Sequence, residues 1–224
     1  MVTLNLRKSV KVLMTLAAIL LVNPAGKLAA QGPIWEVGAA GGGSIYLNKS
    51  FDARSGSATA GFGNSFGVSA WLGHNLHRYV SGEFRYTYQN NGPLVEAEGR
   101  DVTMSGRSHA VHYDVLVHTS ERGASIRPFF TAGFGTKGYW GTGEESQFQP
   151  LQDYALLTRT SEWKPLVVFG GGVKIKIGER SQLRLELRDY TTPFPKNVVA
   201  PAPGADLGGW IHNLAPMVGF SVVF

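Results

Sequence analysis

The feature that most constrains the fold is a period-two alternation of side-chain types that recurs along the chain. Residues 183–188 read LRLELR, so leucines alternate with Arg184, Glu186 and Arg188. Successive side chains of a strand point to opposite faces, and this alternation therefore predicts a strand with one apolar and one charged face. The final segment, NLAPMVGFSVVF (213–224), also alternates and ends on an aromatic residue. A terminal strand of this kind indicates two different environments on its two sides.

Eight strand-like stretches follow one another from about residue 34. We expect them near residues 34–46, 58–72, 79–89, 102–119, 125–140, 165–178, 182–192 and 210–224. The connections after the second, fourth and sixth stretches are short (GHNLHR, SERGAS and GERS), whereas the others are longer. Because an up-and-down meander places alternate connections at opposite ends, one end would carry short turns and the other long loops. The sequence thus predicts an all-β, eight-stranded, antiparallel up-and-down barrel.

The first 30 residues have the layout of a secretory signal peptide. A basic start (Arg7, Lys8, Lys11) precedes an apolar run at 12–22 and a small-residue cleavage site at 28–30. We therefore predict a signal peptide at 1–30 and a barrel at 31–224. The whole chain carries 21 Lys+Arg and 16 Asp+Glu, but the first 30 residues contain four of the bases and none of the acids, so the remainder has 17 − 16 = +1. Such a balance does not favour nucleic-acid binding.

Cysteine is absent from the sequence, which excludes disulfides and thiolate metal sites. Charged residues of both signs recur on one face of successive predicted strands. This predicted lumen charge network comprises Glu36, Glu83, Arg85, Asp114, Lys137, Lys174, Lys176, Arg184, Glu186 and Arg188. The interior of an eight-stranded barrel is just wide enough for side chains to fill it, so paired charges can be stable there.

Large aromatic residues gather near the strand ends, as in interfacial girdles. We expect Trp35, Trp71 and Tyr79 at one end, and Tyr88, Trp140, Trp163 and Trp210 at the other. Together with the charged inner face, they indicate that the apolar face meets lipid, which makes the barrel transmembrane. A soluble ligand-binding barrel, with the apolar face turned inward, is the alternative.

Three segments carry a resemblance to a known family: RPFFTAGFGTKGYW (127–140), LRLELRDYTTPFP (183–195) and HNLAPMVGFSVVF (212–224). They resemble the small bacterial outer-membrane β-barrel domain family of OmpA/OmpX-type architecture, over essentially all of 34–224. The resemblance implies a bacterial outer-membrane location with both mature termini periplasmic. It also implies insertion by the outer-membrane assembly machinery, which reads a C-terminal strand matched here by Val218, Phe220, Val222 and Phe224. No peptidoglycan-binding domain follows the barrel, so cell-wall anchoring is not implied.

Three motifs could carry chemistry, and each also has a structural explanation. Gly63–Gly67 matches G-x-S-x-G, but a nucleophile elbow needs a helix after the strand, and the alternation here favours a plain barrel strand. His109, His112 and His118 lie around Asp114, where hydrogen bonding in the lumen competes with metal binding. His118-Thr119-Ser120 resembles the His-x-Ser pair of barrel-type lipid A deacylases, yet it lies at a predicted periplasmic turn, far from lipid A.

The sequence therefore predicts a non-enzymatic integral outer-membrane protein with an envelope-structural or surface-contact role. A narrow passive channel for small solutes and a lipid A-modifying enzyme are the alternatives. We expect outer-membrane lipids and lipopolysaccharide as surroundings, a monomeric state, and no cofactor, metal or nucleic acid.

Overall fold

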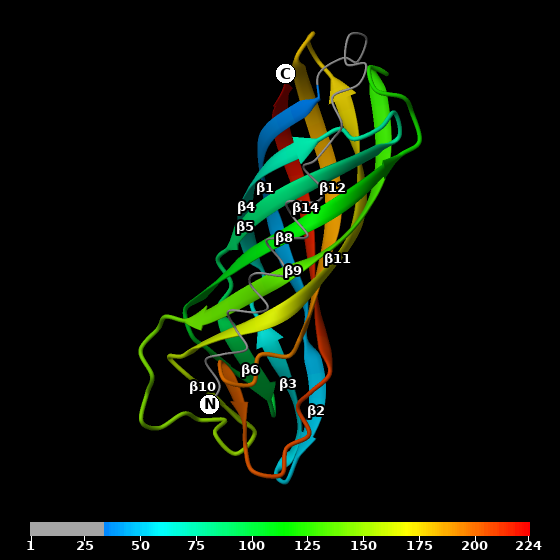
Figure 1. Cartoon of the computed structure of the whole chain (residues 1–224). Coiled ribbons are helices and arrows are strands. Elements are labelled where there is room, and N and C mark those ends of the chain that lie inside the picture. The colour runs from blue at the N-terminus through cyan, green and yellow to red at the C-terminus, as the bar shows by residue number, and fades with distance from the viewer. Residues whose placement is uncertain (1–33) are drawn as a thin grey trace, which may run out of the picture. The chain divides into compact units, whose positions relative to one another are not determined.

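Eight antiparallel strands close into a barrel in the computed structural model, which describes residues 34–224 (Figure 1). The barrel strands are β1 (Trp35–Leu47), β4 (Ser65–His74), β5 (Val80–Gln89), β8 (Gly106–His118), β9 (Ile126–Gly141), β11 (Ser161–Lys176), β12 (Ser181–Pro193) and β14 (Trp210–Val223). The last strand closes against the first, with Ala39 opposite Phe220. The predicted eight-stranded antiparallel barrel is thus confirmed. The predicted signal peptide lies outside the described residues.

The wall of the barrel is apolar outside and polar inside. Phe130 and Phe134 are 70% and 65% exposed on the outer face, whereas Arg184 and Arg188 are fully buried within. This distribution is the reverse of that in a water-soluble domain, where arginine is almost never fully buried unless it is paired. Within residues 34–224, no helix has the length and hydropathy needed to cross a membrane.

The two ends of the barrel differ, as the alternation of short and long connections predicts. Short turns at 75–79, 119–125 and 177–180 lie at one end, here called the turn end, together with both ends of the described segment. There the amide of Ile34 donates to the carbonyl of Phe224 at 3.1 Å. The four long connections lie at the opposite end, called the loop end.

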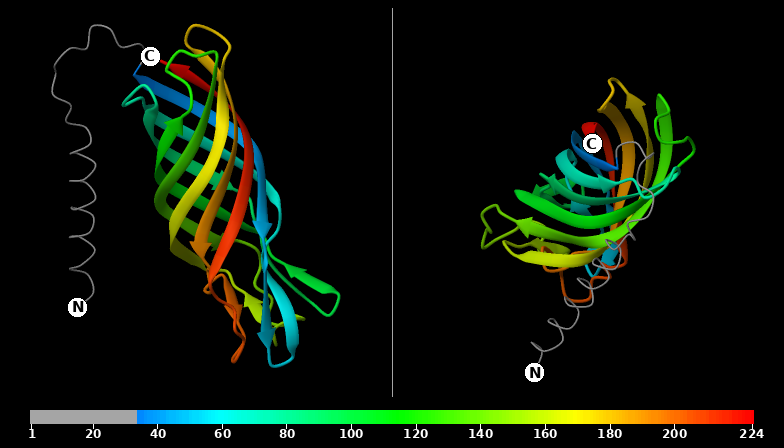
Figure 2. Two further views of the ribbon diagram at one scale, coloured as in Figure 1. Left: turned by 90° about the vertical axis from the view of Figure 1, so that its right-hand side faces the viewer. Right: turned by 45° about the horizontal axis from the view of Figure 1, so that its top comes forward.

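The long connections form an ordered structure, which we call the cap (Figure 2). A four-stranded sheet has the order β2 (Lys49–Ala53), β3 (Gly56–Phe62), β6 (Pro93–Ala97) and β7 (Arg100–Thr103). A second sheet pairs β10 (Ala155–Leu157) with β13 (Val199–Pro201). For this region the sequence predicts only loops and the beginnings of two long strands. The predicted strand 58–72 is instead divided between cap and barrel, and so is 102–119.

The division of the predicted strand 58–72 has a local cause at Gly63 and Asn64. The side-chain oxygen of Asn64 accepts a hydrogen bond from the amide of Tyr46 at 3.0 Å, which ends the regular ladder. Gly63 bonds through its amide to the carbonyl of Gly92 at 2.8 Å, and through its carbonyl to the side chain of Asn91 at 2.9 Å. The chain therefore leaves the barrel wall at Gly63 and pairs within the cap.

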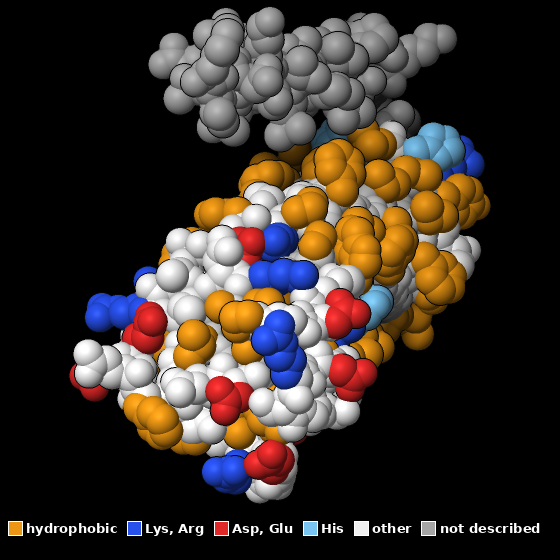
Figure 3. All heavy atoms as spheres, turned by 90° about the horizontal axis from the view of Figure 1, so that it is seen from below, with side chains coloured by type: hydrophobic (Ala, Val, Ile, Leu, Met, Phe, Trp, Pro, Cys, Tyr) orange, Lys and Arg blue, Asp and Glu red, His pale blue; other side chains and the backbone are white. Residues whose placement is uncertain are grey.

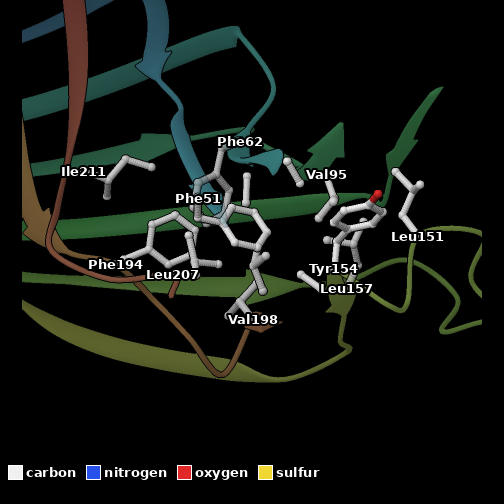
Figure 4. Close-up of a cluster of buried hydrophobic side chains, with 14 of the residues drawn as sticks. Phe51, Phe62, Val95, Leu151, Tyr154, Leu157, Phe194, Val198, Leu207 and Ile211 are labelled. Carbon is white, nitrogen blue, oxygen red and sulfur yellow. The ribbon is translucent and has the colours of Figure 1, made fainter. Parts of the chain in front are cut away.

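The cap has a hydrophobic core of its own (Figure 4). Aromatic and aliphatic side chains from the cap and from the loop ends of the barrel strands build it, and its buried members include Tyr46, Phe51, Phe62, Tyr139, Leu151, Tyr154, Leu157, Phe194, Val198, Leu207 and Ile211. The ring of Phe62 lies 5.0 Å from that of Tyr139 and 4.9 Å from that of Tyr46. These three rings close the loop end of the barrel.

The turn between β6 and β7 is strained, and it contacts a neighbouring loop of the cap. Glu98 and Gly99 have φ values of 53° and 72°, so both central residues of this two-residue hairpin turn are left-handed. Glycine and asparagine are the usual residues in such a turn, and a glutamate there is strained. The Glu98 carboxylate accepts a hydrogen bond from the Tyr154 hydroxyl at 2.9 Å and pairs with Arg100 at 2.8 Å. These contacts fix the strained residue against the loop that carries Tyr154.

We predict that the link between Glu98 and Tyr154 weakens in acid. The hydrogen bond from Tyr154, followed by that from Arg100, lowers the pKa of the Glu98 carboxyl. A carboxyl with a lowered folded-state pKa stabilises the folded state above its unfolded pKa, and this contribution is lost as the pH falls through the folded pKa. Proteolysis at 142–160 should therefore accelerate below about pH 4 in the parent. In the Glu98→Gln variant, the rate of proteolysis at 142–160 should no longer rise in acid. If proteolysis of the variant accelerated below about pH 4 as it does in the parent, the Glu98 carboxylate would not be the group that holds Tyr154.

Candidate functional site

The barrel lumen holds an ion-pair network built from the inward-facing positions of five strands. Four carboxylates (Glu36, Glu83, Asp114, Glu186) face four cations (Arg85, Lys174, Arg184, Arg188), so the charges balance, 4 − 4 = 0. All eight side chains are buried. The period-two pattern brings them together because β1, β5, β8, β11 and β12 each turn alternate residues toward the lumen.

Glu83 and Glu186 lie at the centre of the lumen network. Glu83 accepts from Arg85 at 2.7 Å, from Arg184 at 2.5 Å and from Arg188 at 2.9 Å. Glu186 pairs with Arg85 at 2.6 Å and with Arg188 at 3.1 Å. Because each carboxylate meets several guanidinium groups, the network is cross-linked across the barrel.

The remaining pairs extend the network toward both ends of the barrel. Arg188 also pairs with Asp114, which in turn bonds His112 at 2.7 Å. Toward the turn end, Lys174 pairs with Glu36 at 2.5 Å. The network thus runs along much of the lumen.

Trp71 does not lie in the aromatic girdle, where the sequence predicts it to be. Its indole lies inside the barrel, 4.4 Å from the Arg85 guanidinium and 4.7 Å from that of Arg184, and its N–H donates to Glu36 at 3.2 Å. The strand parity explains this: Trp71 shares the inward face of β4 with Ser69, whereas Leu72 faces outward. Trp163 and Trp210 are half-exposed on the outer wall near the loop end.

Two lysines of the predicted network lie apart from it. Lys137 is buried, but its ammonium donates to Gln89 at 2.6 Å and Asn213 at 2.9 Å. The ring of Tyr46 lies 5.0 Å from the same ammonium group. Lys137 thus belongs to a polar layer between the ion pairs and the cap core. Lys176 is exposed, contrary to the prediction, because it is the last residue of β11, where the barrel wall ends.

The histidines considered for metal binding are separated by the fold. His109 faces outward and bonds the hydroxyl of Tyr86 at 2.6 Å, whereas His112 faces the lumen beside Asp114. His118 bonds the hydroxyl of Ser81 at 2.8 Å inside the lumen. In the part of the chain from residue 34 onward, no group of three or more potential metal ligands comes together.

The other motifs have plain structural roles. Gly63 and Asn64 form the break between β3 and β4, and Ser65 begins β4 without a following helix. The residues of the expected assembly signal are Val218 and Phe220, exposed on the outward face of β14, half-buried Val222 on the same strand, and exposed Phe224 directly after it.

The cap is the part of this region that the sequence did not reveal. Its core depends on contacts between four connections far apart in sequence, such as the Tyr154 hydroxyl bonding the carbonyl of Ser55 at 3.0 Å. One available signal is the short, mostly apolar segment PLVEA (93–97), which is β6. Figure 3, seen from the loop end, shows charges of both signs over the cap and apolar side chains over the barrel wall beside it.

This architecture is that of the small eight-stranded outer-membrane β-barrels, and the comparison with solved structures agrees. The chain is similar to OprG of Pseudomonas aeruginosa, with a TM-score of 0.56, 9% identity, and coverage of 86% of this chain and 97% of that one. It is similar to the outer membrane protein AlkL in lipid bilayers, with a TM-score of 0.52, 13% identity, and coverage of 91% and 96%. It is also similar to Neisserial surface protein A, with a TM-score of 0.51, 11% identity, and coverage of 85% and 97%.

The resemblance seen in the sequence to outer-membrane barrels of OmpA/OmpX-type architecture is therefore confirmed at the level of the fold. No protein-family model matches the chain, and no curated protein matches it.

Proposed function

We propose that the chain is a non-enzymatic integral protein of the bacterial outer membrane with an envelope-structural or surface-contact role. The observation that carries this proposal is the combination of an exposed apolar wall with a buried, charge-balanced ion-pair network in the lumen. Outer-membrane barrels present an apolar band to lipid and a polar interior. The ordered cap would be the surface available for contact outside the cell.

The orientation we propose places the turn end and both mature termini in the periplasm. Its support is the usual arrangement of outer-membrane barrels, with short turns in the periplasm and long loops outside. Membrane fractionation, followed by gel mobility with and without boiling, tests the embedded barrel. We expect recovery with outer membranes and a mobility shift on boiling; a chain that stays in solution without detergent would refute it.

A narrow channel is the competing function, and the packing of the lumen argues against it. Arg85, Arg184 and Arg188 are fully inaccessible to water, as are Lys137 and Tyr139 nearer the cap. Their burial supports a lumen filled by side chains over an open aqueous path. We therefore expect no steady single-channel conductance from the folded protein in planar bilayers at neutral pH, and a lasting conductance would favour the channel.

Lipid A modification also finds little support in the site. The His118 imidazole bonds Ser81 inside the lumen at 2.8 Å, so it is directed away from lipid and from the Ser120 of the His-x-Ser pair. Mass spectrometry of lipid A from cells with and without the protein tests this reading. We expect identical lipid A spectra.

The partners we propose are the outer-membrane assembly machinery, during insertion, and lipids including lipopolysaccharide afterwards; the folded chain would be a monomer. The exposed apolar side chains of Val218 and Phe220 on β14, and of Phe224 directly after it, support the first of these. Phe224→Ser should reduce the heat-shifted, membrane-inserted fraction in cells while the purified chain still folds in detergent. Normal insertion of the variant would contradict the proposal.

A further inference from the structure

The charges outside the lumen are distributed unequally between the two ends of the barrel. The turn end holds five bases (Arg78, Arg122, Arg127, Lys176, Arg180) and two acids (Glu121, Glu179), so its balance is 5 − 2 = +3. The cap and adjoining loop-end residues hold seven bases (Lys49, Arg54, Arg100, Arg107, Arg159, Lys164, Lys196) and nine acids (Asp52, Glu96, Glu98, Asp101, Glu144, Glu145, Asp153, Glu162, Asp206), so the balance is 7 − 9 = −2. An excess of positive charge thus lies at the turn end.

Three of the turn-end arginines have partners within the protein. Arg127 is directed inward, where its guanidinium bonds the side chain of Asn75 at 3.2 Å and the carbonyl of Arg78 at 2.9 Å. Arg122 donates to the carbonyl of Asn75 at 2.7 Å, and Arg78 lies 3.7 Å from Glu121. These contacts hold two of the short turns together.

Lys176 and Arg180 differ from those three arginines. They flank the same tight turn between β11 and β12, and both side chains are exposed. Neither side chain makes a hydrogen bond or ion pair with any residue in the described segment 34–224. The nearby Glu179 is not within ion-pair distance of either. Two cations without an ion-pair partner in the described segment therefore lie on one turn.

The surroundings of this turn are apolar. Ile177, between the two cations, is 57% exposed; Ile126, on neighbouring β9, is 60% exposed, and Phe224 is 57% exposed. A charge at the edge of a lipid-facing apolar wall lies at the level of lipid headgroups, where Lys and Arg are attracted to anionic lipids. The chemistry that fits this turn is a phosphate joined to acyl chains.

We propose that Lys176 and Arg180 form a binding site for the headgroup phosphate of an anionic glycerophospholipid such as phosphatidylglycerol. The proposal rests on the membrane embedding proposed above. It commits to a glycerophospholipid because the site lies at the end opposite the cap, in the leaflet that short turns face in outer-membrane barrels. The acyl chains would lie along the exposed side chains of Ile177 and Ile126.

Tryptophan positions make this site measurable. Trp35 lies at the turn end, where its ring is 4.6 Å from that of His74, and Trp163 lies on the outer wall near the loop end. Trp71 is buried in the lumen, so lipid-borne quenchers should not reach it. One variant (W140F, W163F, W210F) keeps Trp35 as the lipid-facing reporter. A second (W35F, W140F, W210F) keeps Trp163.

Both reporters are folded into phosphatidylcholine vesicles in which a fraction of the lipid is brominated phosphatidylglycerol or brominated phosphatidylcholine. At Trp35 we expect brominated phosphatidylglycerol to associate more strongly, on the order of threefold, because cations near a headgroup phosphate favour an anionic lipid. Trp163 should show no such preference. Adding K176Q and R180Q should abolish the preference at Trp35, whereas adding R54Q and R159Q, which removes the same charge from the loop end, should preserve it.

The outcomes separate this proposal from the embedding on which it rests. If neither brominated lipid quenches Trp163, the barrel is not embedded and the proposed function fails. If both lipids quench Trp163 but Trp35 shows no preference, or keeps its preference in the K176Q/R180Q variant, the lipid site is wrong while the embedding stands. An equal preference at both tryptophans would also overturn the site.

Discussion

Arg188→Met is expected to destabilise the barrel by about 3–5 kcal/mol, because it leaves buried carboxylates without their cation. Arg188 pairs with Asp114, with Glu83 at 2.9 Å and with Glu186 at 3.1 Å, and its side chain is fully buried. Removing it changes the balanced ion-pair network to four carboxylates and three cations. Urea-induced unfolding in lipid vesicles, followed by tryptophan fluorescence, measures the loss.

Two further variants separate charge imbalance from lost packing. Glu83→Gln combined with Arg188→Met restores the balance, to three of each sign, and should recover part of the stability. Arg54→Met removes an exposed arginine from the cap and should change stability by less than about 0.5 kcal/mol. If Arg188→Met unfolded at the same urea concentration as the parent, the lumen network would not stabilise the fold.

Phe62→Ala is expected to open the cap while leaving the barrel folded. The Phe62 ring is buried between those of Tyr46 and Tyr139, and truncating a buried phenylalanine typically costs about 3–5 kcal/mol. Because the cap core is separate from the smaller apolar cluster within the barrel around Trp71 and Val168, the loss should be local. Limited proteolysis should cut within 142–160, while the mobility shift on boiling persists.

Phe130→Ala is the matched control for the cap variant. Phe130 is the same residue type, but it is exposed on the outer wall of β9, so its truncation leaves no cavity in the cap. Proteolysis of the cap in Phe130→Ala should then be as slow as in the parent. Equal cap protection in Phe62→Ala and Phe130→Ala would show that the apolar cluster does not hold the cap together.

The barrel could be predicted from the sequence because its strands carry local information. In LRLELR the parity alone assigns Arg184, Glu186 and Arg188 to the lumen, and the structure places them there. Lys176 follows the same parity as Lys174, but a strand pattern does not show where the wall ends, so its exposure was missed. The prediction for Trp71 is wrong because its position in the alternation of β4, and not its residue type, decides which face it occupies.

The cap could not be predicted because its stability comes from contacts between distant connections. The ring of Phe62 meets that of Tyr139, and the hydroxyl of Tyr154 reaches the carbonyl of Ser55. Each loop alone contains a few apolar residues among glycines and charges, which is also the pattern of a solvated loop. The break at Asn64 was likewise hidden, because its cause is a hydrogen bond to the backbone of Tyr46 in another strand.

A single-cysteine fluorescence experiment tests most directly whether lipid covers the apolar wall while the cap stays in water. The chain has no cysteine of its own, so an environment-sensitive probe can be placed at one position at a time. We compare probes at Phe134 and Val218 on the outer wall with one at Ser57 in the cap, all in lipid vesicles. We expect blue-shifted emission at Phe134 and Val218, quenched by spin-labelled lipid but not by aqueous iodide, and the reverse at Ser57. Iodide quenching at Phe134 and Val218 with no effect of the spin-labelled lipid would contradict a membrane-embedded barrel.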